Sequence, residues 1–441
     1  MTERKKLLLF AAKLGYQTRS LDAAAQRLGV DVIFVTDRCH QLDDPWGDRA
    51  IAVHFESPDL AAYSVMEAVR KLGPNGEPAT IDGILAFGDR PAVAAAYVAR
   101  GLGLAYNHPA AVEACRSKLR MREVFRDAGL PGLWFRSVAV SPIAEPALMG
   151  IAYPCVLKPI SLSASQGVVR ANSRAEFVAA AERIRRLLGS PEILARKEAG
   201  LDRLIVEGYI PGKEVAVEGL LTDGELRVLA IFDKPDPLEG PYFEETIYVT
   251  PSRRSAAEQS EIEKSARDAA RALGLTQGPV HAEFRVNEER IWPLEVAPRP
   301  IGGLCARALR FVGADGEVVG LEELLLRHAV GLPGGDWARE AEASGVMMIP
   351  VPKSGVLERV DGVEAARGVA GITEVEMTAR VHDFIAAWPE GASYLGFLFA
   401  RGRTPEGVEQ SLREAHAALT FTITEQLTVE HPATGKMVGH S

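Results

Sequence analysis

The chain has 441 residues, which at roughly 150 residues per domain predicts about three domains. Hydrophobic residues make up 47% and charged residues 25%, and this balance excludes a disordered or fibrous protein. The formal net charge of −9 argues against a nucleic-acid partner, because phosphate contacts need clustered Lys and Arg.

The cysteines and the apolar runs bear on the cellular location of the protein. The cysteines form no CxxC pair, which disfavours a zinc site and a disulfide framework; they are Cys39, Cys115, Cys155 and Cys305. The apolar run Leu7–Phe10 is too short for a signal peptide, and no stretch approaches the roughly 18 apolar residues of a membrane span. We therefore expect a cytoplasmic protein without a membrane partner.

Residues 1–113 predict a parallel α/β domain. Three apolar runs read as strands: Lys6–Phe10, Val32–Val35 and Gly83–Phe87. They alternate with helical stretches around residues 20–28, 59–72 and 91–101, which is βαβ patterning. One further helix is expected near 110–128, ending where Gly129 and Pro131 stop it.

Residues 114–330 predict a small α/β module followed by an antiparallel sheet. The module has strands at 154–158 and 204–207 around the helix Ser173–Leu188. The sheet strands are expected at 215–221, 227–232, 247–250, 280–285 and 291–295, with a packed helix at 255–273. Residues 331–441 then predict a separate α+β domain, with strands near 345–351, 355–359, 372–378 and 394–400 and a helix at 404–419.

The first chemical motif is Lys158 at a strand end, followed by a Ser/Gly-rich loop. An ammonium group beside a flexible loop with free N–H and hydroxyl donors suits phosphate groups. The loop residues that offer these donors are Ser163, Ser165, Gln166 and Gly167. The loop lacks the Gly-Lys-Ser/Thr ending of a Walker A motif, and taken alone a surface lysine before a linker is equally plausible.

The second motif is the strand ending in Glu207, continued by Gly208, Tyr209 and Ile210, with Glu214 seven residues after the first carboxylate. Backbone groups of such a segment can recognise a purine, and a carboxylate can bind ribose hydroxyls. Seen in isolation, the segment favours a strand–turn–strand that carries solvated glutamates.

The third motif is a pair of carboxylates, Glu283 and Glu295, on two strands joined by the turn at residues 287–289. Two such groups can bridge a hard cation such as Mg²⁺, and Arg299 adds a planar fork for phosphate or carboxylate. The alternative is a pair of exposed strand residues bound to Arg285 or Arg299.

In this order and spacing the motifs resemble the ATP-grasp superfamily, over roughly residues 1–330. The resemblance implies an ATP-grasp core with a lid at about 150–212. It also implies phosphate contacts from Lys158 and from Lys118, which stands in a Ser-Lys-Leu-Arg-Met-Arg segment. It further implies a mobile loop at 161–167, an adenine hinge at Glu207–Ile210, Glu214 on the ribose, and metal ligation by Glu283 and Glu295. Arg299 would steady the transferring phosphoryl group.

One position departs from the family pattern, because Ala297 stands where many members have a metal-binding Asn. Small residues also occupy this position in the carboxylate–amine and L-amino-acid ligase branch, which the chain resembles most. Glu245 would then supply an oxygen to the metal or bind the amine, and Lys234 would act near the γ-phosphate.

Two further residues have structural alternatives. Asp89 follows a parallel strand and could line a substrate cleft, but it suits helix capping better. His281 should lie on the same strand face as Glu283. It could line the cleft, but a histidine packed in the core is slightly preferred.

The resemblance implies an ATP-dependent ligase that converts a carboxylate, an amino acid in this branch, to an acyl phosphate and joins it to an amine. The cofactors would be ATP and Mg²⁺, with Mn²⁺ as the alternative cation, and a homodimer is common in the family. Two rivals stay open: a bicarbonate-activating carboxylase, although no Met-Lys-Met biotinylation site occurs, and a non-catalytic ATP-binding protein.

Overall fold

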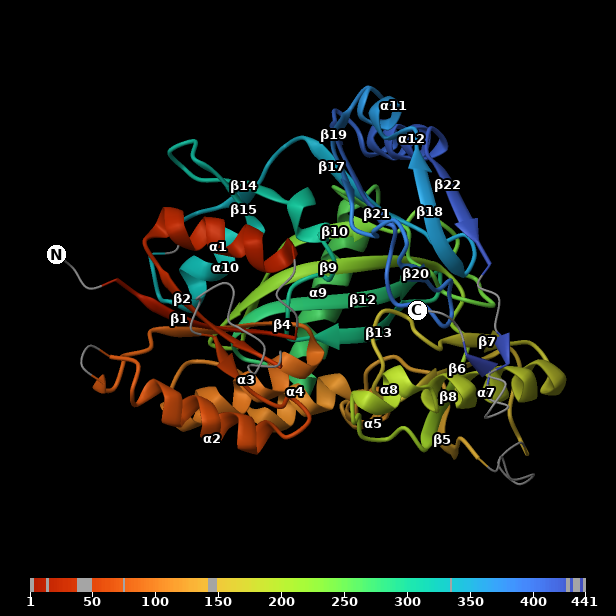
Figure 1. Ribbon diagram of the computed structural model, residues 1–441, viewed down its shortest axis with the longest axis horizontal. Helices are drawn as coiled ribbons and strands as arrows, with labels where there is room; N and C mark the ends of the chain where they lie inside the picture. The colour runs from red at the N-terminus through yellow and green to blue at the C-terminus, as the bar shows by residue number, and fades with distance from the viewer. Residues whose placement is uncertain are drawn as a thin grey trace.

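The computed structural model describes residues 4–12, 16–37, 50–73, 76–141, 149–333, 335–425, 429–430 and 437–438. A long central sheet runs across the molecule, with the N-terminal strands at its left, most of the N-terminal helices and a smaller sheet below it, and the C-terminal elements above (Figure 1). The expected mixed α/β and α+β architecture is confirmed.

The N-terminal sheet is parallel, as predicted, with strand order β3-β2-β1-β4. Its strands are β1 (Lys6–Ala11), β2 (Asp31–Thr36), β3 (Ile51–Ala52) and β4 (Gly83–Phe87). Its helices are α1 (Tyr16–Leu28), α2 (Pro58–Val69) and α3 (Asp89–Leu102). Leu8 and Phe10 are fully buried against Val65 and Ala95, which is why the strands are uniformly apolar.

The single helix expected near residues 110–128 is two helices, α4 (Pro109–Arg116) and α5 (Lys118–Asp127). Ser117 between them has an extended backbone, and its side chain accepts a hydrogen bond from the Arg120 N–H. A serine at this place therefore ends one helix and caps the next, which places Lys118 in the first turn of α5.

The lid is an antiparallel sheet of order β5-β8-β6-β7, covered by helices α7 and α8. The strands are β5 (Phe135–Ala139), β6 (Cys155–Pro159), β7 (Val169–Ala171) and β8 (Arg203–Gly208). The helices are α7 (Arg174–Leu188) and α8 (Pro191–Ala195). Ser173 caps α7, because its side chain accepts a hydrogen bond from Glu176 N–H.

The central sheet has strand order β13-β12-β9-β10-β11-β17-β21-β19 and is antiparallel at each pairing. Its first part comprises β9 (Lys213–Thr222), β10 (Glu225–Asp233), β11 (Ile247–Thr250), β12 (Gly278–Val286) and β13 (Ile291–Ala297). It continues with β17 (Ala343–Ile349), β19 (Ile372–Met377) and β21 (Gly396–Gly402). The sheet thus runs past residue 330, where we placed a domain boundary from the sequence.

Helix α9 (Ala256–Leu273) packs against the central sheet through Ile262, Ala266 and Leu273. A capping box between Ser255 and Glu258 begins it, and Gly274 in a left-handed conformation ends it, so its bounds match the sequence prediction.

The remaining elements lie around the C-terminal strands. They are η2 (Cys305–Ala308), α10 (Leu321–Ala329), α11 (Val363–Arg367), α12 (Pro405–Ala417), β14 (Arg310–Val312), β15 (Val318–Gly320), β16 (Ala338–Arg339), β18 (Gly355–Asp361), β20 (Phe384–Ile385), β22 (Thr420–Thr424), β23 (Val429–Glu430) and β24 (Met437–Val438). One small sheet has order β15-β14-β16 and another β20-β18-β22.

Cys115, Cys155 and Cys305 are buried and form no disulfide. Cys39 lies outside the described residues. Among the described residues, no helix combines the length and apolar character that a membrane crossing requires.

Gly83→Ala tests how tightly the N-terminal sheet packs on α10. A β carbon at Gly83 would lie 2.0 Å from the Ala329 carbonyl oxygen, so the substitution should lower the free energy of unfolding by about 1–3 kcal/mol. Gly132→Ala is the matched control, since nothing lies within 4 Å of its β carbon position. Equal denaturation midpoints for the two variants would contradict the close packing.

Candidate functional site

Most residues predicted to bind ATP line one narrow pocket of about 80 Å³ between the lid strands and the central sheet. The predicted residues in its wall are Lys118, Lys158, Ser165, Glu207, Gly208, Tyr209, Ile210, Glu214, Glu283 and Glu295. They come from α5, β6, the lid loop, β8 and the segment after it, β9, β12 and β13. The fold therefore brings together residues that lie between positions 118 and 295 of the sequence.

Glu207, near the end of β8, is held by two cations. Its Oε1 lies 2.5 Å from Lys158 Nζ, and its Oε2 accepts a 2.6 Å hydrogen bond from Arg122 Nε. Burial alone would raise the pKa of Glu207, but Arg122 and Lys158 lower it to about 2. The Glu207 carboxylate is therefore ionised, and it orients Lys158 at the pocket wall.

A second cavity of about 690 Å³ adjoins the first. It contains the predicted residues Ser163, Arg299 and Glu245, and its far wall comes from residues 378–397 of the C-terminal region. Arg299 Nε donates a 2.7 Å hydrogen bond to Asp89 Oδ1. Burial would raise the pKa of Asp89, but Arg299 lowers it, so both groups are charged.

The preference for Asp89 as a helix cap is wrong. The N-cap of α3 is Gly88, and the Asp89 carboxylate turns to Arg299 and the larger cavity instead. An arginine 210 residues away outcompetes a local N–H group because a charge-assisted bond in a partly buried place is the stronger one.

Three residues line both cavities: Ser165 in the lid loop, and Glu283 and Glu295 on paired strands. Glu283 and Glu295 are direct partners in the register of β12 and β13, so their side chains emerge side by side. Glu295 Oε2 lies 4.0 Å from Lys118 Nζ. The expected convergence of the two glutamates on a pocket shared with Lys158 is thus present.

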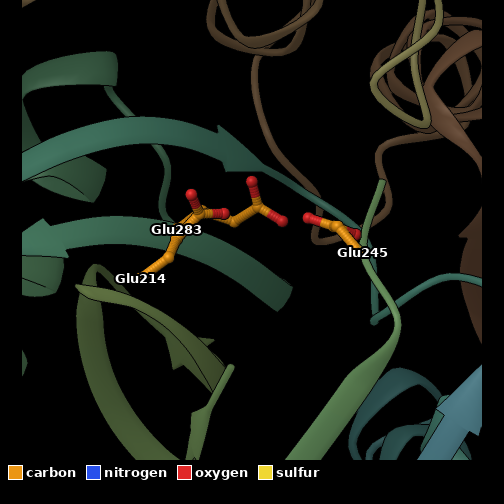
Figure 2. Close-up of side chains that lie close together, drawn as sticks. All are labelled: Glu214, Glu245 and Glu283. Atoms are coloured by element: carbon orange, nitrogen blue, oxygen red, sulfur yellow. The ribbon is translucent and has the colours of Figure 1, made fainter. Parts of the chain in front are cut away.

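Lys234 lies beneath this junction and contacts three carboxylates. Its Nζ is 2.7 Å from Glu214, 2.5 Å from Glu245 and 2.9 Å from Glu283, and its side chain is only 3% exposed. Burial disfavours the charged ammonium, yet the three carboxylates raise the pKa of Lys234 well above its ordinary value. In Figure 2, Glu245 faces Glu214 and Glu283 from a separate segment of chain.

His281 and Glu283 share a strand face, as predicted, with His281 Nε2 3.4 Å from Glu283 Oε1. The other ring nitrogen, Nδ1, bonds to Glu218. Burial alone would lower the pKa of His281, but Glu218 raises it to about 9. The residue is buried and also borders the larger cavity, so both sequence alternatives describe part of its position.

Two family descriptions match this chain. The family description "ATP-grasp domain" matches residues 151–308, and "L-amino acid ligase C-terminal domain 2" matches residues 347–424. The chain contains an ATP-grasp domain and an L-amino acid ligase C-terminal domain. Its C-terminal region has the character expected of the L-amino-acid ligase branch.

This ATP-grasp protein resembles ligases of several kinds. It is 26% identical over 348 residues to alanine–anticapsin ligase of Bacillus amyloliquefaciens, covering 76% of this chain and 72% of that one. It is 28% identical to formate-dependent phosphoribosylglycinamide formyltransferase of Bordetella bronchiseptica, covering 87% and 88%. The crystal structure of L-amino acid ligase from Bacillus licheniformis superimposes with a TM-score of 0.78 at 24% identity, covering 96% of this chain and all of that one.

Besides Ser163, which lines only the larger cavity, two predicted lid-loop residues do not line the narrow pocket. Gln166 is buried and donates a 2.6 Å hydrogen bond from Nε2 to the Glu390 carbonyl oxygen. The Gly167 N–H donates to the Pro389 carbonyl oxygen at 3.0 Å, with φ +72°. Their place in the loop was predicted, but these contacts with the C-terminal region were not.

Two arginines of the site were given no role in nucleotide binding from the sequence, although Arg285 was considered as an ion-pair partner of Glu283 or Glu295. Arg122 binds Glu207, and Arg285 donates to Glu214, to the Tyr209 hydroxyl and to the Ile210 carbonyl oxygen. Spacing was the available signal, because Arg122 is one helical turn after Lys118 and Arg285 shares the strand face of Glu283.

Lys234→Met tests the buried cluster. Without the ammonium group three buried carboxylates face one another, so we expect the free energy of unfolding to fall by about 3–5 kcal/mol in EDTA. Millimolar Mg²⁺ should restore part of this loss, because carboxylate oxygens are ligands that this ion prefers. Lys264→Met, at an exposed pair with Asp268, is the control. Denaturation curves that coincide for the two variants would contradict the role of Lys234.

Proposed function

We propose that the chain is an ATP-dependent ligase that activates the carboxylate of an amino acid as an acyl phosphate and joins it to an amine. The observation that carries this proposal is the junction of the two cavities. A nucleotide in the narrow pocket would direct its γ-phosphate to Ser165, Glu283 and Glu295, the residues that also border the larger cavity. A carboxylate in the larger cavity can then approach the phosphorus in line.

The narrow pocket suits the parts of ATP in order. Backbone groups of Glu207–Ile210 would meet the adenine, while Lys118 and Lys158 would meet the phosphates. Glu214 would contact the ribose from a position already held by Lys234 and Arg285. These residue roles are part of the proposal.

The carboxylates at the junction fit Mg²⁺, a hard cation that prefers oxygen ligands, and Mn²⁺ has similar preferences. Glu283 and Glu295 would hold it, with Glu245 as a further oxygen donor. Bound there, the ion would neutralise charge on the triphosphate.

The protein side chains contribute positioning and charge. Arg299 is positively charged, lies at the wall of the larger cavity and is oriented by Asp89, so it can stabilise the phosphoryl group during transfer and the acyl phosphate afterwards. The bond from the γ-phosphorus to ADP breaks as the bond to the carboxylate forms. The amine then attacks the acyl carbon, forms the C–N bond and expels phosphate.

The two rivals have less support. The carboxylase has less support because residues 347–424 match the L-amino acid ligase C-terminal domain 2 and because alanine–anticapsin ligase is among the relatives. A non-catalytic binding protein would not need Arg299 and the paired glutamates at one junction. A cytoplasmic location and a homodimer also belong to the proposal. The widely spaced cysteines, of which the three described ones form no disulfide, support the first, and the resemblance to the family supports the second.

The test is an assay with ATP, Mg²⁺ and single amino acids, with hydroxylamine as the amine that traps an acyl phosphate as a hydroxamate. ADP and hydroxamate should form together for some amino acids, and amino-acid pairs should then give condensed products by mass spectrometry. ADP formation that depends on bicarbonate and on no amine would favour the carboxylase. ATP binding without ADP formation across the panel would favour the non-catalytic protein.

Arg299→Ala separates catalysis from nucleotide binding. We expect kcat for hydroxamate formation to fall by about 100- to 1,000-fold, because a charge aimed at the reacting oxygens is lost. The Kd for ATP should change little, since Arg299 borders only the larger cavity and not the narrow pocket. Arg299→Lys should recover part of kcat, and Arg359→Ala, at an exposed pair with Asp361, is the control. A large loss of ATP affinity with unchanged kcat would refute this assignment.

A further inference from the structure

The lid loop is fastened to the C-terminal region by a short segment, residues 388–390. The Trp388 indole N–H donates to the Ala164 carbonyl oxygen at 3.3 Å. Pro389 and Glu390 accept hydrogen bonds through their carbonyl oxygens from Gly167 and Gln166. Consecutive residues of one segment therefore bind the loop that borders both cavities.

An ion pair adds a second attachment. Arg183 of α7 donates to both carboxylate oxygens of Glu390, with Nη2 to Oε2 at 2.8 Å. Its Nη1 also donates to the Tyr242 hydroxyl at 2.5 Å. Helix α7 and the lid loop therefore both contact Glu390, through Arg183 and Gln166. In Figure 1, β20 and the lid elements β7 and α7 lie in neighbouring parts of the molecule.

The loop conformation needs such support. Ala164 has φ +55° and Ser165 has φ +52°, a left-handed backbone that non-glycine residues adopt at a cost. Ser165 is the residue of this loop that borders both cavities. The contacts from residues 388–390 flank Ser165 on both sides, at Ala164 and at Gln166, and so hold it at the junction.

The same segment reaches the larger cavity. Trp388 packs on Tyr394, with ring centroids 4.8 Å apart, and Tyr394 lines the cavity together with Ser393. A direct path of contacts therefore leads from the wall of the larger cavity through Trp388 to the lid loop.

We propose that Arg183, Trp388 and Glu390 are positioning residues that fasten the lid loop over the cavity junction, so that the acyl phosphate meets an amine rather than water. This inference rests on the proposed ligase function. An acyl phosphate open to solvent hydrolyses back to carboxylate and phosphate, which consumes ATP without product. The fastening lowers that loss by holding Ser165 and its neighbours in place.

Charge reversal is the sharpest test, because the pair between Arg183 and Glu390 is accessible and Arg183 lies outside both cavities. Arg183→Glu places two carboxylates together, and the double variant R183E/E390R restores opposite charges. Arg185→Glu is the matched control: it lies on the same helix, and its ion-pair partner Glu182 is also on α7.

The first measurement is hydrogen exchange of the peptide covering residues 161–168 in the full-length protein, with Mg²⁺ and a non-hydrolysable ATP analogue. In R183E this peptide should exchange about fivefold faster than in the unaltered protein, in line with the loss of a partly exposed ion pair. R185E should match the unaltered protein, and R183E/E390R should return towards it. Unchanged exchange in R183E, or an equal increase in R185E, would overturn the proposal.

The second measurement is the ratio of ADP formed to hydroxamate formed, at saturating ATP. R183E should raise this ratio about fivefold, since water then competes with the amine, and R183E/E390R should lower it again. A fall in total rate at constant ratio would mean that the pair is merely structural. If the unaltered protein makes no hydroxamate, the ligase proposal fails, while the exchange measurement still decides whether the segment fastens the loop.

Discussion

The buried ammonium group of Lys234 is the interaction on which the rest of the site depends. A lone buried charge would cost several kcal/mol, and here three carboxylates compensate it. They belong to β9, to the segment before β11 and to β12, so one cation at the end of β10 fixes three separate pieces of chain. Arg285 contacts Glu214 and His281 contacts Glu283, so further positive charge borders the same cluster.

This constraint explains how two cavities meet at one point. Glu283 forms an ion pair with Lys234 and is the cross-strand neighbour of Glu295. Both glutamates therefore keep a defined position where the narrow pocket opens into the larger cavity. On the opposite side Lys158 is tied to Glu207. The lid and the central sheet therefore present fixed charges to each other, which is the preorganisation that phosphoryl transfer requires.

Much of the site could be predicted because its chemistry is local in the sequence. Lys158, Glu207, Glu283 and Glu295 stand at strand ends or on paired strands, and the resemblance of their order and spacing to the ATP-grasp superfamily predicted that they meet in one pocket. Partners could not be predicted in the same way. Asp89 was expected to cap a helix and instead binds Arg299, because ion pairs between distant segments depend on how whole domains pack. The roles of Arg122 and Arg285 were overlooked for the same reason.

The sequence by itself determined the elements, since alternation, apolar runs and capping residues such as Ser255 act over a few neighbours. It also determined the types of ligand, because carboxylates and lysines suit metal-bound phosphates wherever they lie. Only the tertiary structure decided that the central sheet continues through β11 into β17, and that residues 388–390 reach the lid loop. Those contacts join segments 94 to 224 residues apart and depend on the simultaneous burial of several faces, which no local pattern encodes.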